Sequence, residues 1–181
     1  MPANDDLMQT ARARAATVRL MIFDVDGVFT DGSLHFSADG ETRKTFNVLD
    51  GHGIKQLQQY GIACAIISAR NSPMVARRAA DLGIAHVRQG VHDKLQAFQE
   101  LLESEGLPAH ACGFVGDDVI DLPILIRVGF AVSVPNGHPE VRARVHYVSQ
   151  AGGGRGAVRE ICDFILRAQG KYETALAAYL S

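Results

Sequence analysis

Three aspartates, Asp24, Asp26 and Asp31, lie within eight positions of one another in the stretch MIFDVDGVFTDG, residues 21–32. An apolar run leads directly into Asp24, so the carboxylates follow a candidate buried strand. Carboxylates crowded in such a place repel one another and are costly to desolvate. Their spacing therefore predicts a bound cation that offsets the repulsion.

Polar side chains also follow other candidate strands. Ser68 ends the run IACAIIS, Asp117 and Asp118 follow ACGFVG, and Asp121 comes about one helical turn later. Lys94 opens the amphipathic stretch after AHVRQ. Because functional groups of an open α/β sheet collect beyond the carboxyl ends of its strands, we expect these side chains to face one pocket.

This set of groups favours phosphoryl transfer. Carboxylate oxygens without a neighbouring thiolate or imidazole pair suit Mg²⁺, which keeps several waters and leaves room for a phosphate oxygen. Asp24 is placed to attack phosphorus, and Asp26, two residues on, to exchange protons with the leaving alkoxide and the attacking water. Lys94 and the Ser68 hydroxyl would hold the remaining phosphoryl oxygens.

Short apolar runs alternate with amphipathic stretches along the chain. The candidate strands are 18–24, 62–68, 85–89, 111–116, 130–134 and 145–149. The candidate helices are 51–60, 72–82, 93–105, 118–127, 138–143 and 157–168. This alternation predicts a three-layer α/β/α, Rossmann-like fold with a parallel sheet covered on both faces.

One segment departs from the alternation. Residues 33–50 carry the turn signal Ala38-Asp39-Gly40 between LHF and KTFNV, which predicts a small β-hairpin at about 33–48, inserted after the first strand. With Phe36 and Phe46 on an apolar face, it would act as a short lid or as an edge for oligomerisation.

The rest of the chain divides simply. We expect a loose leader over 1–17, a single domain over 18–170 and a tail over 171–181.

The formal net charge of −2 gives no indication of nucleic-acid or membrane-surface binding, and no apolar run approaches the length of a membrane span. The three scattered cysteines predict buried thiols in a reducing cytoplasm rather than a disulfide framework.

The motifs DVDGVFTDG, IISAR, Lys94 and GDDVIDLP, in this order, resemble the four motifs of the haloacid-dehalogenase superfamily. The likeness extends from Arg19 to Gly170, and the short hairpin, RQGVHDK and the segment AGGGRGAVREICDFILRAQGK narrow it to capless phosphatases of sugar-acid phosphates. ISAR departs from the family's ITGR, but Ser68 keeps the hydroxyl of the threonine that it replaces.

The resemblance implies roles for individual residues. Asp24 would be nucleophile and metal ligand, Asp26 acid/base and backbone-carbonyl ligand, and Asp117 the third protein ligand of Mg²⁺, with Mn²⁺ or Co²⁺ as possible substitutes. Ser68 and Lys94 would bind phosphate, and Asp121 would steer the waters of the metal. The expected substrate contacts are Thr30, Asp31, Arg70 and Arg155. The resemblance further implies a homotetramer whose hairpins form a central barrel and whose subunits complete one another's active sites.

Three alternatives stay open at this point. One is a phosphatase for a different sugar acid, such as a sialic-acid-type 9-phosphate. Another is a non-catalytic phosphate-binding module, and the last is a receiver-like signalling domain, although its acceptor aspartate would follow the third strand. For single residues the alternatives are local: Asp31 as a turn residue, Arg70 in a loop salt bridge and Asp118 as a helix cap.

Overall fold

A computed structural model describes residues 2–180 and contains a six-stranded parallel sheet in the order β5-β4-β1-β6-β7-β8. The strands are β1 (Leu20–Phe23), β4 (Ala63–Ile67), β5 (His86–Arg88), β6 (Cys112–Val115), β7 (Phe130–Ser133) and β8 (Tyr147–Val148). Each lies inside a strand predicted from the sequence. β1 is buried along its whole length, as a continuous apolar run in the centre of a parallel sheet requires.

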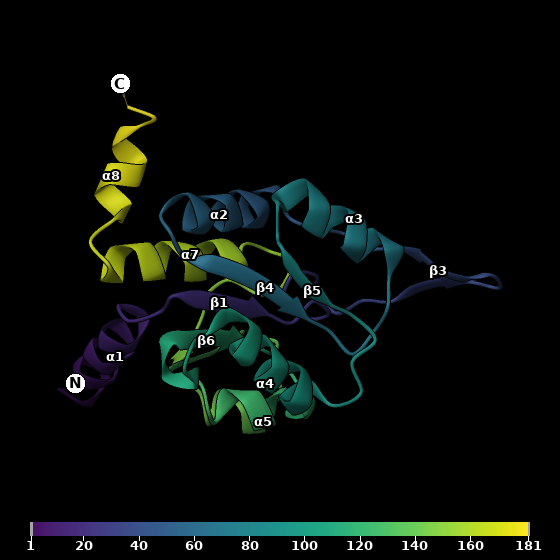
Figure 1. The fold of residues 1–181 in the computed structure, drawn as a ribbon, viewed down its shortest axis with the longest axis horizontal. Coiled ribbons are helices and arrows are strands. Elements are labelled where there is room, and N and C mark those ends of the chain that lie inside the picture. Colours follow the sequence, from purple (N-terminus) through teal and green to yellow (C-terminus); the bar gives the residue numbers. More distant parts are fainter. Residues whose placement is uncertain (1, 181) are drawn as a thin grey trace.

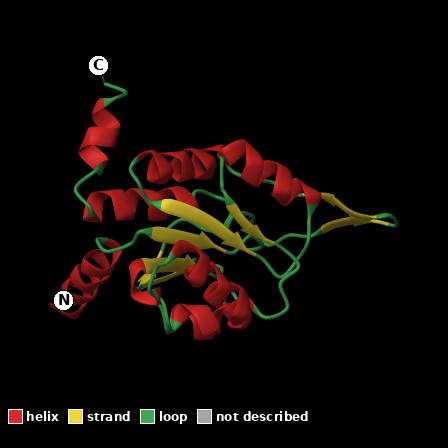
Figure 2. Ribbon diagram, in the orientation of Figure 1, coloured by secondary structure: helices red, strands yellow, loops and turns green. Residues whose placement is uncertain are grey.

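Helices cover both faces of the sheet (Figures 1 and 2). The helices are α1 (Pro2–Ala15), α2 (Val48–Gln59), α3 (Pro73–Leu82), α4 (Lys94–Glu105), α5 (Leu122–Leu125), α6 (Pro139–Arg142), α7 (Ala157–Ala168) and α8 (Tyr172–Ala177), with short 3₁₀ turns at η1 (Ala109–Ala111) and η2 (Val119–Asp121). One core cluster joins the sheet to α1, α2, α3 and α7, and the other joins it to α4, α5 and α6. The predicted three-layer α/β/α fold is confirmed.

The register of the sheet brings the polar strand ends together. Phe23, the last residue of β1, is opposite Ile66 of β4 on one side and Val115 of β6 on the other. Asp24 therefore continues a row that includes the residues just before Ser68 and Asp117. The glycines Gly83 and Gly106, which end α3 and α4 in the left-handed conformation, turn the chain back toward the sheet.

The predicted hairpin is present as β2 (His35–Ser37) and β3 (Gly40–Arg43), and it projects from the edge of the molecule where the strands of the large sheet end (Figure 1). Gly40 has a φ of +120°, which suits the glycine of the tight turn. Phe36 is 58% exposed on β2, as expected for an apolar hairpin face. Phe46 was wrongly assigned to that face: it lies beyond β3 and packs against the core beside Val25 and Phe29.

The two chain ends contain more structure than a loose leader and tail. Residues Pro2–Ala15 form α1, which packs on α7 and buries Ala11 and Ala15. Ala11 and Ala15 lie on one face of this mostly polar helix, and their small side chains let it approach the domain closely. Two alanines at this spacing are too common for the sequence to predict that the helix packs on the domain. After Gly170 the chain forms α8, and Tyr179 contacts the ring of His52 on α2.

Within residues 2–180, no helix is both long and apolar enough to cross a membrane. Cys64, Cys112 and Cys162 are buried and free, as the sequence predicts.

Candidate active site

The carboxylate of Asp24 lies directly beyond β1 and is only 6% exposed. Its backbone N–H donates to the carbonyl of Val115 at 3.0 Å, which continues the pairing of β1 with β6 by one residue. The sheet itself therefore fixes the position of Asp24, before any side-chain contact is considered.

Lys94, the first residue of α4, reaches this carboxylate from the neighbouring layer. Its Nζ lies 2.9 Å from Oδ1 of Asp24 and 2.6 Å from Oδ1 of Asp121, and its side chain is 3% exposed. Asp93 caps α4 by accepting the N–H of Gln96, which places Lys94 on the first turn. A lysine buried this deeply requires paired carboxylates, and here two acids from different segments share one ammonium.

Asp121 holds the loop after β6 in shape. Its Oδ2 accepts the N–H groups of Asp117 and Asp118 at 3.0 and 3.2 Å, and its Oδ1 is held by Lys94. Asp118 accepts the N–H of Val119 and forms a capping box with Asp121, so the cap alternative for Asp118 is confirmed. Both oxygens of Asp121 are thus already engaged, which suits a residue that orients the site.

Asp117 has a carboxylate without a hydrogen-bond or ion-pair partner among the described residues, although it lies among other acids. Asp24, Asp117 and Asp121 each offer an oxygen within 4.8 Å of the others. Gly27 makes room for Asp117, because a Cβ at position 27 would meet its Oδ2 at 2.0 Å. The loop after β1 and the loop after β6 therefore meet at this carboxylate.

Burial and the charges of neighbouring acids raise the pKa of Asp24 and of Asp117. Burial, followed by the charge of Asp121, raises the pKa of Asp24 to about 6 against the opposing effect of Lys94. Burial, followed by the charges of Asp24, Asp121 and Asp118, raises the pKa of Asp117 to about 7. Burial alone would lower the pKa of Lys94, but Asp24 and Asp121 raise it, so Lys94 stays charged.

These residues fit a divalent cation. Three ionised carboxylates and one ammonium leave a charge of −2 in a largely buried space. The donors are all oxygens, which favours Mg²⁺ over softer metals. The backbone carbonyl of Asp26, the further ligand expected from the sequence, accepts no hydrogen bond from the described residues and is available to such an ion.

Asp26 takes part in a second ion-pair cluster, which the sequence did not reveal. Lys44, directly after β3, pairs with Oδ1 of Asp26 and lies 3.0 Å from Oε1 of Glu41. Arg70 approaches Oδ2 of Asp26 at 3.8 Å and Glu41 at 3.7 Å. Nothing in the sequence separates Lys44 from Arg43 beside it, which is exposed. Only the way the hairpin folds back on the β1 loop identifies it.

Ser68 is 2% exposed at the end of β4, beside β1 in the sheet. Its N–H donates to the carbonyl of Arg88 and its carbonyl accepts from Val91, so its backbone is fixed on both sides. No protein partner of its hydroxyl is found within residues 2–180, which leaves that group available to a ligand.

The other expected substrate contacts lie around the rim. Thr30 is 3% exposed, and its hydroxyl accepts the N–H groups of Gly27 and Gly32, so it organises the loop itself. Asp31 accepts the N–H of Ser33, a bond that lowers its pKa, and Arg155 lies 3.8 Å from it. Oδ1 of Asp31 therefore makes the turn contact expected from the alternative interpretation. Oδ2 faces Arg155, whose side chain is 75% exposed.

Asn136 is a further residue that the sequence did not reveal. Its Nδ2 donates to the carbonyl of Gly27 at 2.9 Å, and its Oδ1 accepts the N–H of Gly153 at 2.8 Å. Position 153 requires glycine, because a Cβ there would lie 1.8 Å from the Gly27 carbonyl oxygen. Asn136 thus connects the loop after β1 to the glycine-rich loop that carries Arg155.

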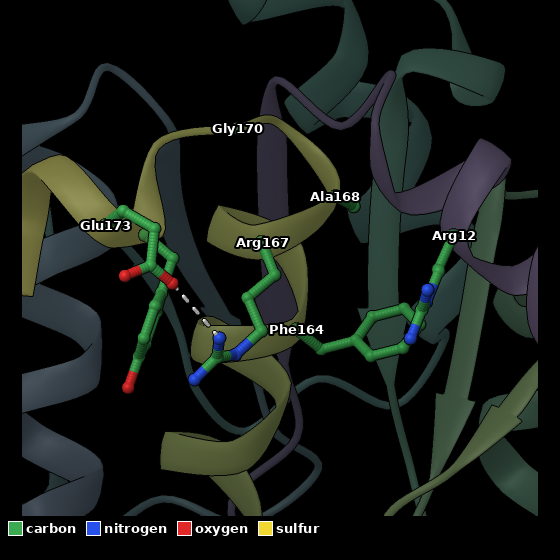
Figure 3. Close-up of a pocket in the computed structure, with 7 residues that line it drawn as sticks. Arg12, Phe164, Arg167, Ala168, Gly170 and Glu173 are labelled. Carbon is green, nitrogen blue, oxygen red and sulfur yellow. Dashed lines mark hydrogen bonds and ion pairs between the residues drawn. The ribbon is translucent and has the colours of Figure 1, made fainter.

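A separate pocket of about 300 Å³ lies between α1 and the end of α7, at the opposite edge of the sheet (Figure 3). Its one carboxylate, Glu173, is turned toward Arg167 at 3.5 Å, and Arg12 and Phe164 complete the wall. Among the described residues that line this pocket, no group of acids gathers as it does around Asp24. The acids around Asp24 are therefore the candidate active site.

Comparison with known proteins agrees with this geometry. Residues 85–160 match the model of the haloacid dehalogenase-like hydrolases. The chain is 46% identical over 174 residues to the 3-deoxy-D-manno-octulosonate 8-phosphate phosphatase KdsC of Yersinia pestis, an alignment that covers 96% of this chain and 91% of the relative.

Solved structures give the same result. The 3-deoxy-D-manno-octulosonate 8-phosphate phosphatase of Moraxella catarrhalis, in complex with magnesium ion, phosphate ion and KDO, superposes with a TM-score of 0.90 at 41% identity, over 97% of this chain and 98% of that one. The cobalt-bound phosphatase of Haemophilus influenzae superposes with a TM-score of 0.89 at 39% identity, over 93% and 99%. The chain belongs to the 3-deoxy-D-manno-octulosonate 8-phosphate phosphatase family of the haloacid dehalogenase-like hydrolases.

Proposed function

We propose that this chain hydrolyses 3-deoxy-D-manno-octulosonate 8-phosphate (Kdo 8-phosphate) to Kdo and inorganic phosphate, a step toward lipopolysaccharide. The observation that carries the proposal is the buried carboxylate of Asp24, paired with Lys94 and lying beside Asp117. The likeness to phosphatases of this substrate over nearly the whole chain supports the choice of sugar. No observation favours a sialic-acid-type 9-phosphate or a receiver domain.

Asp24 acts as the nucleophile. One of its oxygens forms a bond to phosphorus while the bond from phosphorus to the C8 oxygen of the sugar breaks, which leaves an aspartyl-phosphate. Asp26 gives a proton to the departing alkoxide and then takes one from the water that attacks the aspartyl-phosphate. The products are Kdo and phosphate, and both carboxyl groups return to their starting states.

Lys94 and Ser68 hold the phosphoryl oxygens. Lys94 brings positive charge directly to the nucleophile, and the hydroxyl of Ser68, which has no protein partner among the described residues, offers a hydrogen-bond donor from the adjacent strand. A Mg²⁺ held by Asp24, Asp117 and the Asp26 carbonyl, with Asp121 orienting its surroundings, would neutralise negative charge on the acids and on the phosphoryl group. Mn²⁺ or Co²⁺ would serve in its place.

The sugar acid lies toward the rim. Arg70 and Arg155 supply cations for its carboxylate, and Thr30 and Asp31 shape the loop between them. Guanidinium groups suit this task because they bind carboxylates through two parallel hydrogen bonds.

The hairpin serves assembly. The exposed Phe36 and Leu34 on a two-stranded ribbon support a homotetramer built around the hairpins, in which neighbouring subunits complete each site. The three free, buried thiols support work in the cytoplasm.

The test is turnover of a panel of sugar-acid phosphates with and without Mg²⁺. We expect Kdo 8-phosphate to give the highest kcat/KM, and EDTA to abolish turnover until Mg²⁺ is restored. A higher kcat/KM for a sialic-acid-type 9-phosphate would reassign the substrate. Turnover unaffected by chelation would contradict the metal site.

A further inference from the structure

Each of the two proposed catalytic acids is paired with a buried lysine. Lys94 pairs with Asp24, and Lys44 pairs with Asp26; their side chains are 3% and 1% exposed. Lys94 belongs to one of the motifs that carry the family resemblance, whereas Lys44 lies at the foot of the hairpin, outside those motifs. From this parallel, and resting on the proposed function of Asp26, we infer that Lys44 is a positioning residue that holds the Asp26 carboxyl group in place for proton transfer.

The contacts of Asp26 divide its two oxygens. Lys44 engages Oδ1, while the one charged group near Oδ2 among the described residues is Arg70 at 3.8 Å, beyond hydrogen-bond distance. A carboxyl group held through one oxygen presents the other in a fixed direction. Oδ2 is therefore the oxygen left for proton exchange in the proposed reaction, and the contact of Lys44 with Oδ1 sets its direction.

The charges around Lys44 explain why it stays in place. When Asp26 is ionised, as it is between giving its proton to the leaving group and taking one from water, Lys44 and Arg70 are matched by Asp26 and Glu41 and this cluster is neutral. The cluster around Asp24, by contrast, has a charge of −2 and favours a cation. Nothing in the Lys44 cluster calls for a metal ion. Burying the ammonium at this depth is tolerable only because two carboxylates receive it.

Glu41 and Lys44 come from the hairpin, and Arg70 stacks over Phe36 of the same hairpin with its guanidinium carbon 5.6 Å from the ring centroid. The hairpin thus contacts the acid/base residue directly as well as presenting an exposed apolar face. Its foot is part of the catalytic apparatus, acting through Asp26.

The test compares leaving groups that differ in their need for a proton. Kdo 8-phosphate and phenyl phosphate both release a basic oxygen, while dinitrophenyl phosphate releases a stable anion without help. The readout is kcat/KM, which covers the steps through departure of the leaving group and excludes hydrolysis of the aspartyl-phosphate. Phenyl and dinitrophenyl phosphates both lack the sugar, so their ratio is independent of sugar contacts.

Lys44→Met keeps the length of the side chain and removes the ammonium. Because general acid catalysis contributes about 10²- to 10⁴-fold, we expect a loss of at least about 10-fold on Kdo 8-phosphate and phenyl phosphate, and of less than about 3-fold on dinitrophenyl phosphate. Lys44→Arg should recover most of the loss. Lys55→Met, at an exposed lysine on α2, is the matched control and should leave all three values unchanged.

Other results would overturn the inference. An equal loss on all three substrates would make Lys44 a structural or phosphate-binding residue, and a loss confined to Kdo 8-phosphate would make it a sugar contact. The ratio of two values from one preparation does not depend on the fraction of folded enzyme. Should Lys44→Met fail to fold, Lys44→Gln carries the same comparison.

Two reference measurements separate this inference from the proposed function. Turnover of Kdo 8-phosphate by the wild type tests the proposed function. If the wild type does not hydrolyse Kdo 8-phosphate, an alkyl phosphate that the enzyme does hydrolyse replaces Kdo 8-phosphate in the comparison of the three substrates. Asp26→Asn tests the acid and should show the same selective loss, and adding Lys44→Met to it should cause little further change, because the two residues act as one unit. A selective loss for Asp26→Asn without one for Lys44→Met would overturn only the role of Lys44.

Discussion

The Nζ of Lys94 lies 2.9 Å from Oδ1 of Asp24, which joins the start of α4 to the end of β1 across two layers of the fold. The same ammonium reaches Asp121 at 2.6 Å, so three chain segments meet at one charge. Lys94 holds Oδ1 of Asp24 and, in the proposed reaction, leaves the second oxygen for phosphorus. It also offsets part of the repulsion that would otherwise drive Asp24 to take up a proton.

Asp24→Asn removes the proposed nucleophile at nearly constant side-chain volume. We expect kcat to fall at least about 10³-fold, because the neutral amide of asparagine is a poor nucleophile toward phosphorus. The amide can still accept a hydrogen bond from Lys94, so the thermal unfolding midpoint should stay within a few degrees of the wild type. Circular dichroism and a coupled phosphate-release assay on the same preparation check both points. Turnover close to that of the wild type would refute the covalent route.

Mg²⁺ should stabilise the chain more at high pH than at low pH. The raised pKa values of Asp24, about 6, and Asp117, about 7, mean that the folded, metal-free chain holds protons that the unfolded chain releases above about pH 4. The stability that these two groups contribute is therefore lost as the pH rises from about 4 through about 7. A cation binds the deprotonated carboxylates, so it reverses this loss mainly above pH 7.

The measurement is the unfolding midpoint with EDTA or with excess Mg²⁺. At about 100 times its dissociation constant, Mg²⁺ contributes about 2.7 kcal/mol, which corresponds to a rise of roughly 5–10 °C at about pH 8 and a smaller rise at about pH 5. Asp117→Asn should remove most of the difference between the two pH values. An equal Mg²⁺ effect at both pH values would contradict the assignment of these acids as ligands.

The fold was predictable because nearly every local signal agreed with it. The continuous apolar runs of β1 and β6 are typical of strands buried on both faces, and both strands are buried. Gly83 and Gly106 end α3 and α4 in the left-handed conformation, as glycines at helix C-caps do. The stretch 118–127 was less regular than predicted, because the capping box of Asp118 and Asp121 makes a 3₁₀ turn before α5. Phe46 was misplaced because alternation cannot tell where a hairpin ends and its connection to the core begins.

The acidic part of the site was predictable for a topological reason. Asp24 and Asp117 follow adjacent parallel strands, so their proximity depends only on strand order. Lys44 and Asn136 were not predictable, because their contacts depend on how a hairpin and a loop fold back on the β1 loop. A charged residue in a hairpin and an asparagine in a turn are ordinary at the sequence level, and only tertiary structure distinguishes them.

Asn136→Ala should loosen the loop that carries Arg155. The variant removes one hydrogen bond to Gly27 and one to Gly153, each worth about 1 kcal/mol. We expect the unfolding midpoint to fall by a few degrees and KM for Kdo 8-phosphate to rise severalfold, because the loop then holds Arg155, a proposed substrate contact, less firmly. For dinitrophenyl phosphate, which has no sugar carboxylate, KM should change little. Steady-state kinetics on both substrates provide the check, and an equal change in the two KM values would argue against a role in holding Arg155.

Phe36→Glu places a charge on the exposed face of the hairpin. A charge buried at a subunit interface without a partner costs several kcal/mol, so we expect dissociation of a hairpin-centred tetramer toward smaller species. Sedimentation velocity measures the change directly. Leu7→Glu is a suitable control, since Leu7 is also an exposed apolar residue, at 67%, but lies on α1 at the opposite end of the molecule (Figure 1). The fold of each subunit should survive both substitutions, because neither side chain belongs to a core cluster. An unchanged tetramer in Phe36→Glu would place the assembly surface elsewhere than on the hairpin.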